Sequence, residues 1–507
     1  MAVGDITCQD LKLDFERDAA GDTQPKHLKA SGAVEINDPS GKIRAGDLTV
    51  AFGPAQKGGG VEAQFLEAFG NVSIKRDDLD AEGDHIRRDL AAGTLLLEGR
   101  PARAARGQSR IVGPRIDFSQ ADGRASVRGA GELEMPATTD LRGRPRAQAE
   151  PMLIKWQNSM LYEDKRNFAQ FDGGVKAATG GSRLASERLW VYFGERPDKG
   201  TPVAVEATPK APPAKAKAQT DELGQVFGRK ALVRVFAEKE VHATEQQLAP
   251  DGSVKFVMEM VGDNLTYVDE SRKAYIRGPG RLRILARERP RPGEVATAGL
   301  VPNTEEPLWT GPAPDGYART EVGWTDSMAY DGSSDRAYFK GDIEAIHAGR
   351  GVPGEGNTAR RRASETKVRS DDLQVVFTEK TPPEATKAPP EAAKTLPGEQ
   401  AASREERMAV EKFVADGNVH LWVDDRRGSA ARLIYQREPE LLRLYRGTDD
   451  WARLWQENEA TQEFGEIVAR IITYEPSSGR VEVVEQQMMV VSPKTKVPPP
   501  PKKMPLK

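Results

Sequence analysis

An eleven-residue spacing recurs along this chain and constrains its fold more than any other feature. An apolar-x-aromatic pair is followed, eleven positions after the aromatic residue, by a glycine. The pairs with this spacing are Phe118–Gly129, Tyr162–Gly173, Tyr267–Gly278 and Tyr330–Gly341, and Arg88–Gly99 repeats it with arginine in the aromatic position. The residues between the two ends of each pair differ from copy to copy, so chance does not account for the spacing.

The stretch "SMAYDGSSDRAYFKGDIEA" (327–345) shows why the spacing indicates strands. Residues i and i+2 of a strand face the same side, so Met328 and Tyr330 point together. The segment "DGSSD" is rich in residues that form turns, and alternation resumes after the glycine with Ile343 and Ala345. One face is apolar and the other is mostly polar, which is typical of a half-buried antiparallel sheet.

A single strand–turn–strand unit cannot bury its apolar face alone, so repeated units stack and share one core. The sequence therefore predicts an all-β fold, an elongated antiparallel β-jellyroll built from repeated strand–turn–strand units. The repeated glycines are expected to relieve backbone crowding at a turn or bulge, and the repeated aromatic residues to pack across strands.

Segments rich in Pro, Ala, Lys and Glu divide the repeats into three predicted blocks. The expected organisation is 1–205 jellyroll repeats, 206–224 linker, 225–378 second block with loop insertions, 379–406 linker, 407–492 third block and 493–507 disordered Pro/Lys tail.

Composition excludes several classes of protein. The 74 Lys and Arg residues nearly balance the 77 Asp and Glu residues, which disfavours a general nucleic-acid binder. Cys8 is the one cysteine, so neither an internal disulfide nor a thiolate metal cluster can form. No run of about 18 apolar residues is present to span a membrane as a helix. The first residues show no secretion signal, so for an envelope protein we expect a truncated N-terminus or a divergent relative.

Catalytic motifs give no prediction of an enzyme. Neither G-x-S-x-G nor H-E-x-x-H occurs, and we expect no cofactor and no metal. "GRGVPG" (349–354) matches G-x-G-x-x-G, but Pro353 and the absence of a following helix pattern argue against a dinucleotide loop. "ARRRAS" (359–364) is expected to be a solvated basic loop. Structural or surface roles are expected for the five scattered histidines, which are His27, His85, His242, His347 and His420.

Residues 65–118 resemble a known family. The order of "GNV-x-I", "A-x-GD-x-I", "L-x-L-x-G-x-P" and "G-x-x-I-x-F" resembles the OstA-like repeat of the lipopolysaccharide-transport proteins LptA, LptC and the periplasmic part of LptD. "FVADGNVHLWVDDRRGSAARLIY" (413–435) resembles the same repeat. This chain is longer than a single-unit member and carries linkers, which points to a divergent multi-unit relative.

The resemblance implies a twisted jellyroll, open along one side, whose apolar groove takes lipid A acyl chains in the periplasm. It also implies edge-to-edge pairing with other jellyroll proteins and a possible head-to-tail homo-oligomer. The expected partner is lipopolysaccharide or another long-chain lipid, with no nucleic acid. The candidate acyl-chain contacts are Val72, Ile74, Leu95, Leu97, Ile116, Leu133, Val175, Leu265, Ile343, Val419 and Leu421.

Three functions therefore stand open at the level of sequence. The first is a non-enzymatic lipid-binding or lipid-transfer protein of the cell envelope that acts in outer-membrane assembly. The second is a structural or adhesive β-repeat protein, in which the same apolar residues form a closed core and the function is protein contact. The third is a polysaccharide-acting enzyme on a β-scaffold, for which no carboxylate pair stands out in the sequence.

Overall fold

The computed structural model describes most of the chain as strands. It describes residues 5–17, 23–38, 41–54, 61–76, 79–139, 145–195, 230–249, 251–287, 316–348, 365–379, 408–423, 425–437, 439–448, 450–458, 463–476 and 478–493. Within these ranges there is no α-helix, and one 3₁₀ turn spans Asp164–Arg166. The predicted all-β fold of antiparallel strand–turn–strand units is confirmed. The described residues contain no helix that is long and apolar enough to cross a membrane.

The chain divides into two compact units, and each is described by itself. Unit 1 comprises Met1–Val241 with Thr266–Glu270, and unit 2 comprises His242–Leu265 with Ser271–Lys507. The division falls inside the two strands β15 (Lys230–Leu248) and β16 (Val254–Val268). The predicted linker 206–224 and the "GRGVPG" and "ARRRAS" loops lie outside the described residues, as do the predicted linker 379–406 and the predicted tail 493–507 except for their first residues, Glu379 and Pro493, which end strands.

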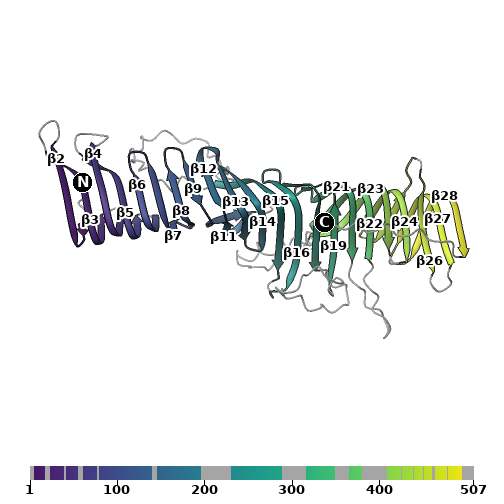
Figure 1. Cartoon of the computed structure of the whole chain (residues 1–507). Coiled ribbons are helices and arrows are strands. Elements are labelled where there is room, and N and C mark those ends of the chain that lie inside the picture. The colour runs from purple at the N-terminus through teal and green to yellow at the C-terminus, as the bar shows by residue number, and fades with distance from the viewer. Residues whose placement is uncertain are drawn as a thin grey trace, which may run out of the picture. The chain divides into compact units, whose positions relative to one another are not determined.

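Unit 1 is an antiparallel sheet in which most long strands pair with the strands before and after them in the sequence, and in three places two consecutive strands share one long neighbour and do not pair with each other (Figure 1). Its strands before β15 are β1 (Asp5–Thr7), β2 (Asp10–Arg17), β3 (Thr23–Asp38), β4 (Gly41–Pro54), β5 (Val61–Arg76), β6 (Leu79–Asp89), β7 (Thr94–Arg106), β8 (Ser109–Ser119), β9 (Arg124–Arg128), β10 (Gly131–Thr139), β11 (Pro145–Trp156), β12 (Ser159–Glu163), β13 (Phe168–Thr179) and β14 (Ser182–Glu195).

Unit 2 repeats this arrangement with strands that are also antiparallel. Its strands after β16 are β17 (Lys273–Arg277), β18 (Gly280–Arg287), β19 (Tyr317–Trp324), β20 (Ser327–Asp331), β21 (Arg336–Ala348), β22 (Glu365–Glu379), β23 (Met408–Val423), β24 (Arg426–Gln436), β25 (Leu441–Tyr445), β26 (Ala452–Asn458), β27 (Glu463–Glu475) and β28 (Arg480–Pro493).

A bulge interrupts the long strands near their middle and bends them. On β5, the register passes from Phe69 opposite His85 to Val72 opposite Gly83, so two residues face one on β6. The same two-against-one shift occurs between β13 and β14, β21 and β22, and β23 and β24. A bulge of this kind bends and twists the strand that carries the extra residue. The bulges lie side by side, so together they form one corner in each unit.

Glycine is required at this corner by its backbone conformation. Gly173 and Gly341 of the repeat have φ of +87° and +80°, and Gly417 at the same place on β23 has φ of +74°, a region that side-chain-bearing residues rarely adopt. Gly129 and Gly278 also have positive φ, at the breaks between β9 and β10 and between β17 and β18. The prediction that the repeated glycines relieve crowding at a bulge is therefore confirmed for these positions.

The corner divides each unit into two half-sheets. Half A ends in hairpins such as 89–94, and half B ends in hairpins such as 106–109. Contacts in unit 2 show that the halves face each other. Arg426 of half B shares its row with Gly465 of β27, yet its guanidinium lies 4.3 Å from the ring of Tyr474, far along the same strand in half A.

Cross-strand pairing aligns the inward-facing apolar side chains into continuous rows. We call one row in each half an inner row: the row nearest the corner in half A, and the second row from the corner in half B. In unit 1, the half A row is Leu11, Ala30, Leu48, Ala68, Ile86, Leu97, Ile116, Val127, Met160, Phe171 and Leu189. The half B row is Ile6, Ile36, Ile43, Ile74, Ala81, Ala104, Ile111, Leu133, Ile154, Ala177 and Leu184.

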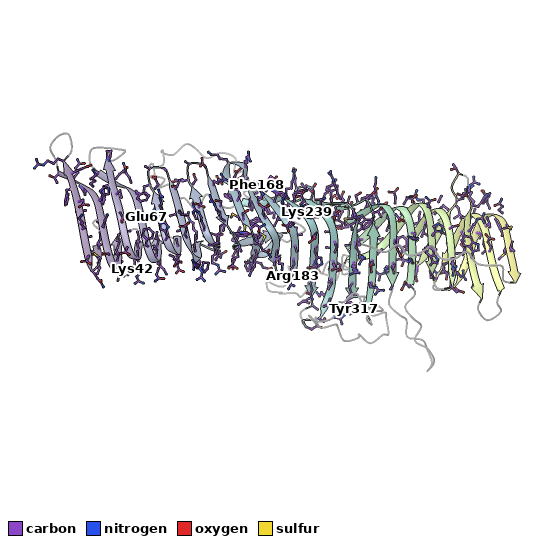
Figure 2. The ribbon with its side chains drawn as sticks, in the orientation of Figure 1. Lys42, Glu67, Phe168, Arg183, Lys239 and Tyr317 are labelled. Carbon is purple, nitrogen blue, oxygen red and sulfur yellow. The ribbon has the colours of Figure 1, made fainter. Side chains whose placement is uncertain are left out.

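Unit 2 has matching inner rows. Its half A row is Ile276, Met328, Phe339, Leu373, Ala415, Leu433, Leu444, Ile472 and Val483. Its half B row is Met260, Leu282, Val322, Ala345, Val368, Leu421, Gly428, Leu454, Ile467 and Met489. Charged residues occupy the alternate, outward positions, among them Lys42, Glu67 and Arg183 of unit 1 (Figure 2).

The corner can be tested with Gly341→Ala. A Cβ at this position would lie 2.7 Å from Thr325 Oγ1 and 2.9 Å from the Cβ of Asp326, and the left-handed backbone adds strain. We expect a loss of about 1–3 kcal/mol in the free energy of unfolding, measured by urea denaturation. Gly465→Ala is the control, because a Cβ there meets nothing within 4 Å, and a change under about 0.5 kcal/mol is expected. Equal effects of the two changes would contradict the role of the corner.

Candidate functional site: the apolar interior

The residues predicted to contact acyl chains lie on inward faces of the two units. Those of unit 1 are Val72, Ile74, Leu95, Leu97, Ile116, Leu133 and Val175, and those of unit 2 are Leu265, Ile343, Val419 and Leu421. All are buried except Ile74, which is half-buried. The residues thus share one kind of environment but fall into two separate interiors.

Within unit 1, pairing brings several predicted contacts together. Leu97 of β7 lies opposite Ile116 of β8, and both side chains are fully buried in the half A inner row. Ile74 and Leu133 share the half B inner row. The sheet on its own would leave one side of these residues exposed, so their burial comes from the facing half. The protein already fills much of the space that a ligand would share.

The interior of unit 1 is less covered toward β1 and β2. The inner-row residues Ile6 and Leu11 are 37% and 56% exposed, and Leu13, in the next row of half A, is 39% exposed. Ile36 and Ile43 are half-buried. None of these residues is among the eleven predicted acyl-chain contacts, although the alternation in "DLKLDFER" (10–17) indicates an apolar face there. They form an exposed apolar patch at this end of the unit.

The inner rows of unit 2 also end in exposed apolar side chains. Val483 and Met489 continue the half A and half B rows onto β28 and are 36% and 63% exposed. The preceding members Ile472 and Leu454 are buried. Among the described strands, β28 pairs with β27 alone, so this interior is uncovered at its last strand.

Polar side chains cross the interior of unit 2 on the side opposite the corner. Thr320 Oγ1 lies 2.9 Å from His347 Nδ1, and the His347 ring lies 6.2 Å from the Tyr435 ring of the opposite half. Burial, together with the nearby Arg437 charge, lowers the pKa of His347 to about 4. The imidazole is therefore neutral near pH 7, and it packs between the two halves as an uncharged polar group.

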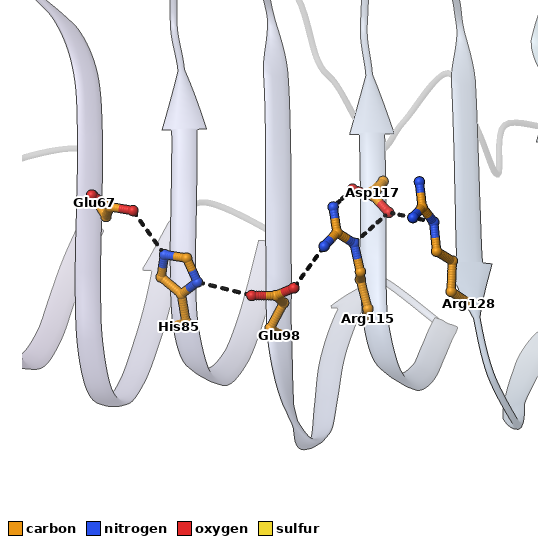
Figure 3. Close-up of polar contacts among 6 residues, drawn as sticks. All are labelled: Glu67, His85, Glu98, Arg115, Asp117 and Arg128. Carbon is orange, nitrogen blue, oxygen red and sulfur yellow. Dashed lines mark hydrogen bonds and ion pairs between the residues drawn. The ribbon is translucent and has the colours of Figure 1, made fainter.

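A chain of charged side chains crosses the outer face of unit 1 (Figure 3). His85 Nε2 lies 3.0 Å from Glu67 Oε1, and His85 Nδ1 lies 3.0 Å from Glu98 Oε2. Arg115 donates to Glu98 Oε1 at 2.8 Å and makes two 3.1 Å hydrogen bonds to Asp117. A structural or surface role is predicted for His85 from the sequence, and in the structure His85 belongs to this chain of charged side chains on the outer face.

The charged groups of this chain have their partners within the chain. Each histidine nitrogen faces a carboxylate, and both can donate only when the ring carries two protons. The Phe69 ring stacks on His85 with centroids 4.4 Å apart. The hydrogen bond from His85, aided by the Arg115 charge and opposed by burial, lowers the pKa of Glu98. Because its cations and carboxylates are paired with one another, the chain ties β5, β6, β7 and β8 together from outside.

The described residues hold no group of three or more His, Cys, Asp or Glu side chains placed to bind a metal ion. In both units apolar rows fill the inside, and in unit 1 paired charges lie on the outside. Chemically, such an interior can remove hydrocarbon from water, at about 0.8 kcal/mol per buried CH₂ group.

Comparisons with known proteins give weak similarities. No protein-family model matches the chain, and no curated protein matches it. The crystal structure of LptH, the LptA homologous periplasmic component of the lipopolysaccharide transport device from Pseudomonas aeruginosa, is 13% identical. It matches 22% of this chain and 73% of that chain with a TM-score of 0.19. A structure of TcdB2-TccC3-TEV is 7% identical and matches 95% of this chain and 29% of that chain, with a TM-score of 0.08. Neither similarity assigns a family.

The burial of the inner row can be tested with Leu97→Asp. A carboxylate in this fully buried position would lack a partner, so we expect unit 1 to unfold or to lose several kcal/mol of stability. Leu96→Asp, on the outward face of the same strand, is the control and is expected to cost less than about 1 kcal/mol. Circular dichroism and urea denaturation measure both. Equal tolerance of the two substitutions would show that the faces are misassigned.

The charged chain predicts a pH dependence for Glu98→Gln. The folded-state pKa of Glu98 is below its ordinary value of 4.5, so its carboxylate contributes stability that is fully present above that value. This contribution is lost as the pH falls through the lowered pKa. The wild type should therefore be more stable than the variant at pH 6, with the difference shrinking as the pH falls below 4.5. A difference that stays constant as the pH falls would contradict the ion pairing.

Proposed function

We propose that this protein is a non-enzymatic lipid carrier of the cell envelope. Its ligand would be lipopolysaccharide or a related long-chain lipid during outer-membrane assembly. The observation that carries the proposal is the course of the inner rows, which stay apolar from strand to strand and end in exposed apolar residues. The likeness of residues 65–118 to the OstA-like repeat agrees with this proposal.

In this proposal, acyl chains enter where the interior is least covered. For unit 1 that end is marked by Ile6, Leu11 and Leu13, and for unit 2 by Val483 and Met489. The chains would then lie against the inner rows, held by the removal of CH₂ groups from water without any single anchoring residue. Since the inner side chains are already buried, the two halves of a unit must move apart to admit a chain. Edge-strand pairing with other jellyroll proteins would extend the same surface.

The runner-up function is a structural or adhesive β-repeat protein, and a specific observation favours it. Ten of the eleven predicted acyl-chain contacts are covered by the protein itself. The contact between His347 and Tyr435 also joins the two halves of unit 2 across the interior. A core of this kind would be closed, and function would then reside in the edges and outer faces.

Photo-crosslinking distinguishes the two functions. We place p-benzoylphenylalanine at the half-buried inner position Ile74 and, as a control, at its outward neighbour Ser73. The labelled protein is expressed in its native envelope, irradiated and analysed by mass spectrometry. Lipid adducts are expected at Ile74 and not at Ser73, because only the inner face lies against acyl chains.

Lipid extracted from the unlabelled protein gives the matching measurement. Purification under mild conditions should yield about one long-chain lipid or more per protein molecule. A folded protein that carries no lipid and gives no adduct at Ile74 would reject the carrier and leave the closed β-repeat protein.

A further inference from the structure

Arg426 has an unusual position, because it is a charged side chain on an inward face. It begins β24 two residues before Gly428, which belongs to the half B inner row of unit 2. The residue is 8% exposed. Its neighbours across the sheet are Val423 and Gln456.

The guanidinium of Arg426 uses only some of its hydrogen-bond donors. Its Nη2 donates to the carbonyl oxygen of Gly479 at 3.0 Å, and its carbon lies 4.3 Å from the centroid of the Tyr474 ring. Its Nε is buried and makes no hydrogen bond within the described part of the chain. No carboxylate in that part contacts Arg426, whereas Arg283 lies 3.2 Å from Glu259 on the outer face.

A buried cation without a counter-ion is costly, and a carbonyl dipole and an aromatic face compensate it only in part. An arginine fork is shaped to donate two parallel hydrogen bonds to a phosphate or a carboxylate. The Nε of Arg426 has no such partner, and the described part of the chain supplies no anionic group to the guanidinium.

Open space lies two strands away from Arg426 along its row. Gly465 lies two strands away in the same row, and a Cβ built on it would meet nothing within 4 Å. The row continues from Gly465 to β28, roughly 14 Å from Arg426 at the usual spacing between strands, where the interior is uncovered. The inner-row residues Leu444 and Leu454 next to this path are apolar and buried.

We infer that Arg426 is an anion-binding residue, which takes the phosphate or carboxylate headgroup of an amphiphile whose hydrocarbon lies along the inner rows of unit 2. This inference rests on the proposed lipid-carrier function and adds the chemical class of the ligand and the residue that selects it. A neutral lipid would leave the guanidinium without a counter-ion, so the interior of unit 2 should prefer acidic amphiphiles.

Isothermal titration calorimetry on the full chain tests the inference with defined probes. The probes are dodecyl phosphate, dodecyl maltoside and inorganic phosphate, the first two below their critical micelle concentrations. Arg426→Gln is expected to weaken dodecyl phosphate binding at least tenfold and to leave dodecyl maltoside binding unchanged. Arg426→Lys, which keeps the charge, should recover most of the affinity. Arg443→Gln is the control, because it removes the same charge from an exposed outward position on β25.

The outcomes separate the inference from the proposed function. Dodecyl phosphate binding that is equal in wild type and Arg426→Gln overturns the inference and leaves the lipid carrier standing. Arg426-dependent binding of inorganic phosphate without binding of either dodecyl probe supports the anion site and rejects the lipid carrier. No binding of any probe to the wild type overturns both.

If Arg426→Gln does not fold, as judged by circular dichroism, competition on the wild type replaces it. Inorganic phosphate in excess should displace dodecyl phosphate and not dodecyl maltoside. Failure to displace dodecyl phosphate selectively would reject an anion site. A purely structural contact between Arg426 and Tyr474 predicts a loss of stability with no such selectivity.

Discussion

The bend at the corner is the constraint on which the rest of each unit depends. A strand that carries Gly341–Asp342 or Gly417–Asn418 has two residues where its neighbour has one, and their left-handed backbone turns the chain from half A into half B. Without this bend the sheet would be flat, and its apolar face would meet water. With it, the same face is covered by the other half of the same strands. Core formation, the facing of Arg426 and Tyr474 and the closure around His347 all follow from it.

The apolar side chains of the resulting interior are arranged along one direction, across the strands. Side chains such as Leu97 and Ile116 repeat from strand to strand, so the apolar surface runs across the strands and is not gathered into one compact core. A surface with this direction suits a long hydrocarbon chain, and it also suits a solid repeat core. Which of the two applies depends on how easily the halves separate, because the protein fills the interior when no ligand is present. The charged chain around His85 and Glu98 resists in-plane sliding of strands and does not cross between the halves.

Much of the fold could be predicted from the sequence, because it is encoded locally. Alternation predicted the strands, the turn segments predicted the hairpins, and the spacing to Gly341 predicted a turn or bulge at that residue, whereas the corner that the bulges form together is seen only in the structure. The predicted contacts all proved to face inward for the same reason. The role of Arg426 could not be predicted in this way. In "VDDRRGSAAR" it looks like part of a polar turn, and its environment is created by Tyr474 and Gly479, which are distant in sequence. The exposure of the apolar residues on β2 and β28 could not be predicted from the sequence either, since alternation shows which side a residue faces but not whether a neighbouring strand covers it.

The two-against-one register at the corner also determines which sequence changes this architecture tolerates. Loops outside the corner can vary in length, because the pairing on either side of them is fixed by the strands. A whole added hairpin would lengthen the interior and keep its cross-section. A single residue inserted beside Gly417 has a different effect, since it reverses the alternation in one half of β23 and would turn Leu421 outward and His420 inward. The register at the corner therefore determines which residues face inward and which face outward. Insertions of two whole strands preserve this assignment, whereas insertions of single residues reverse it in one half.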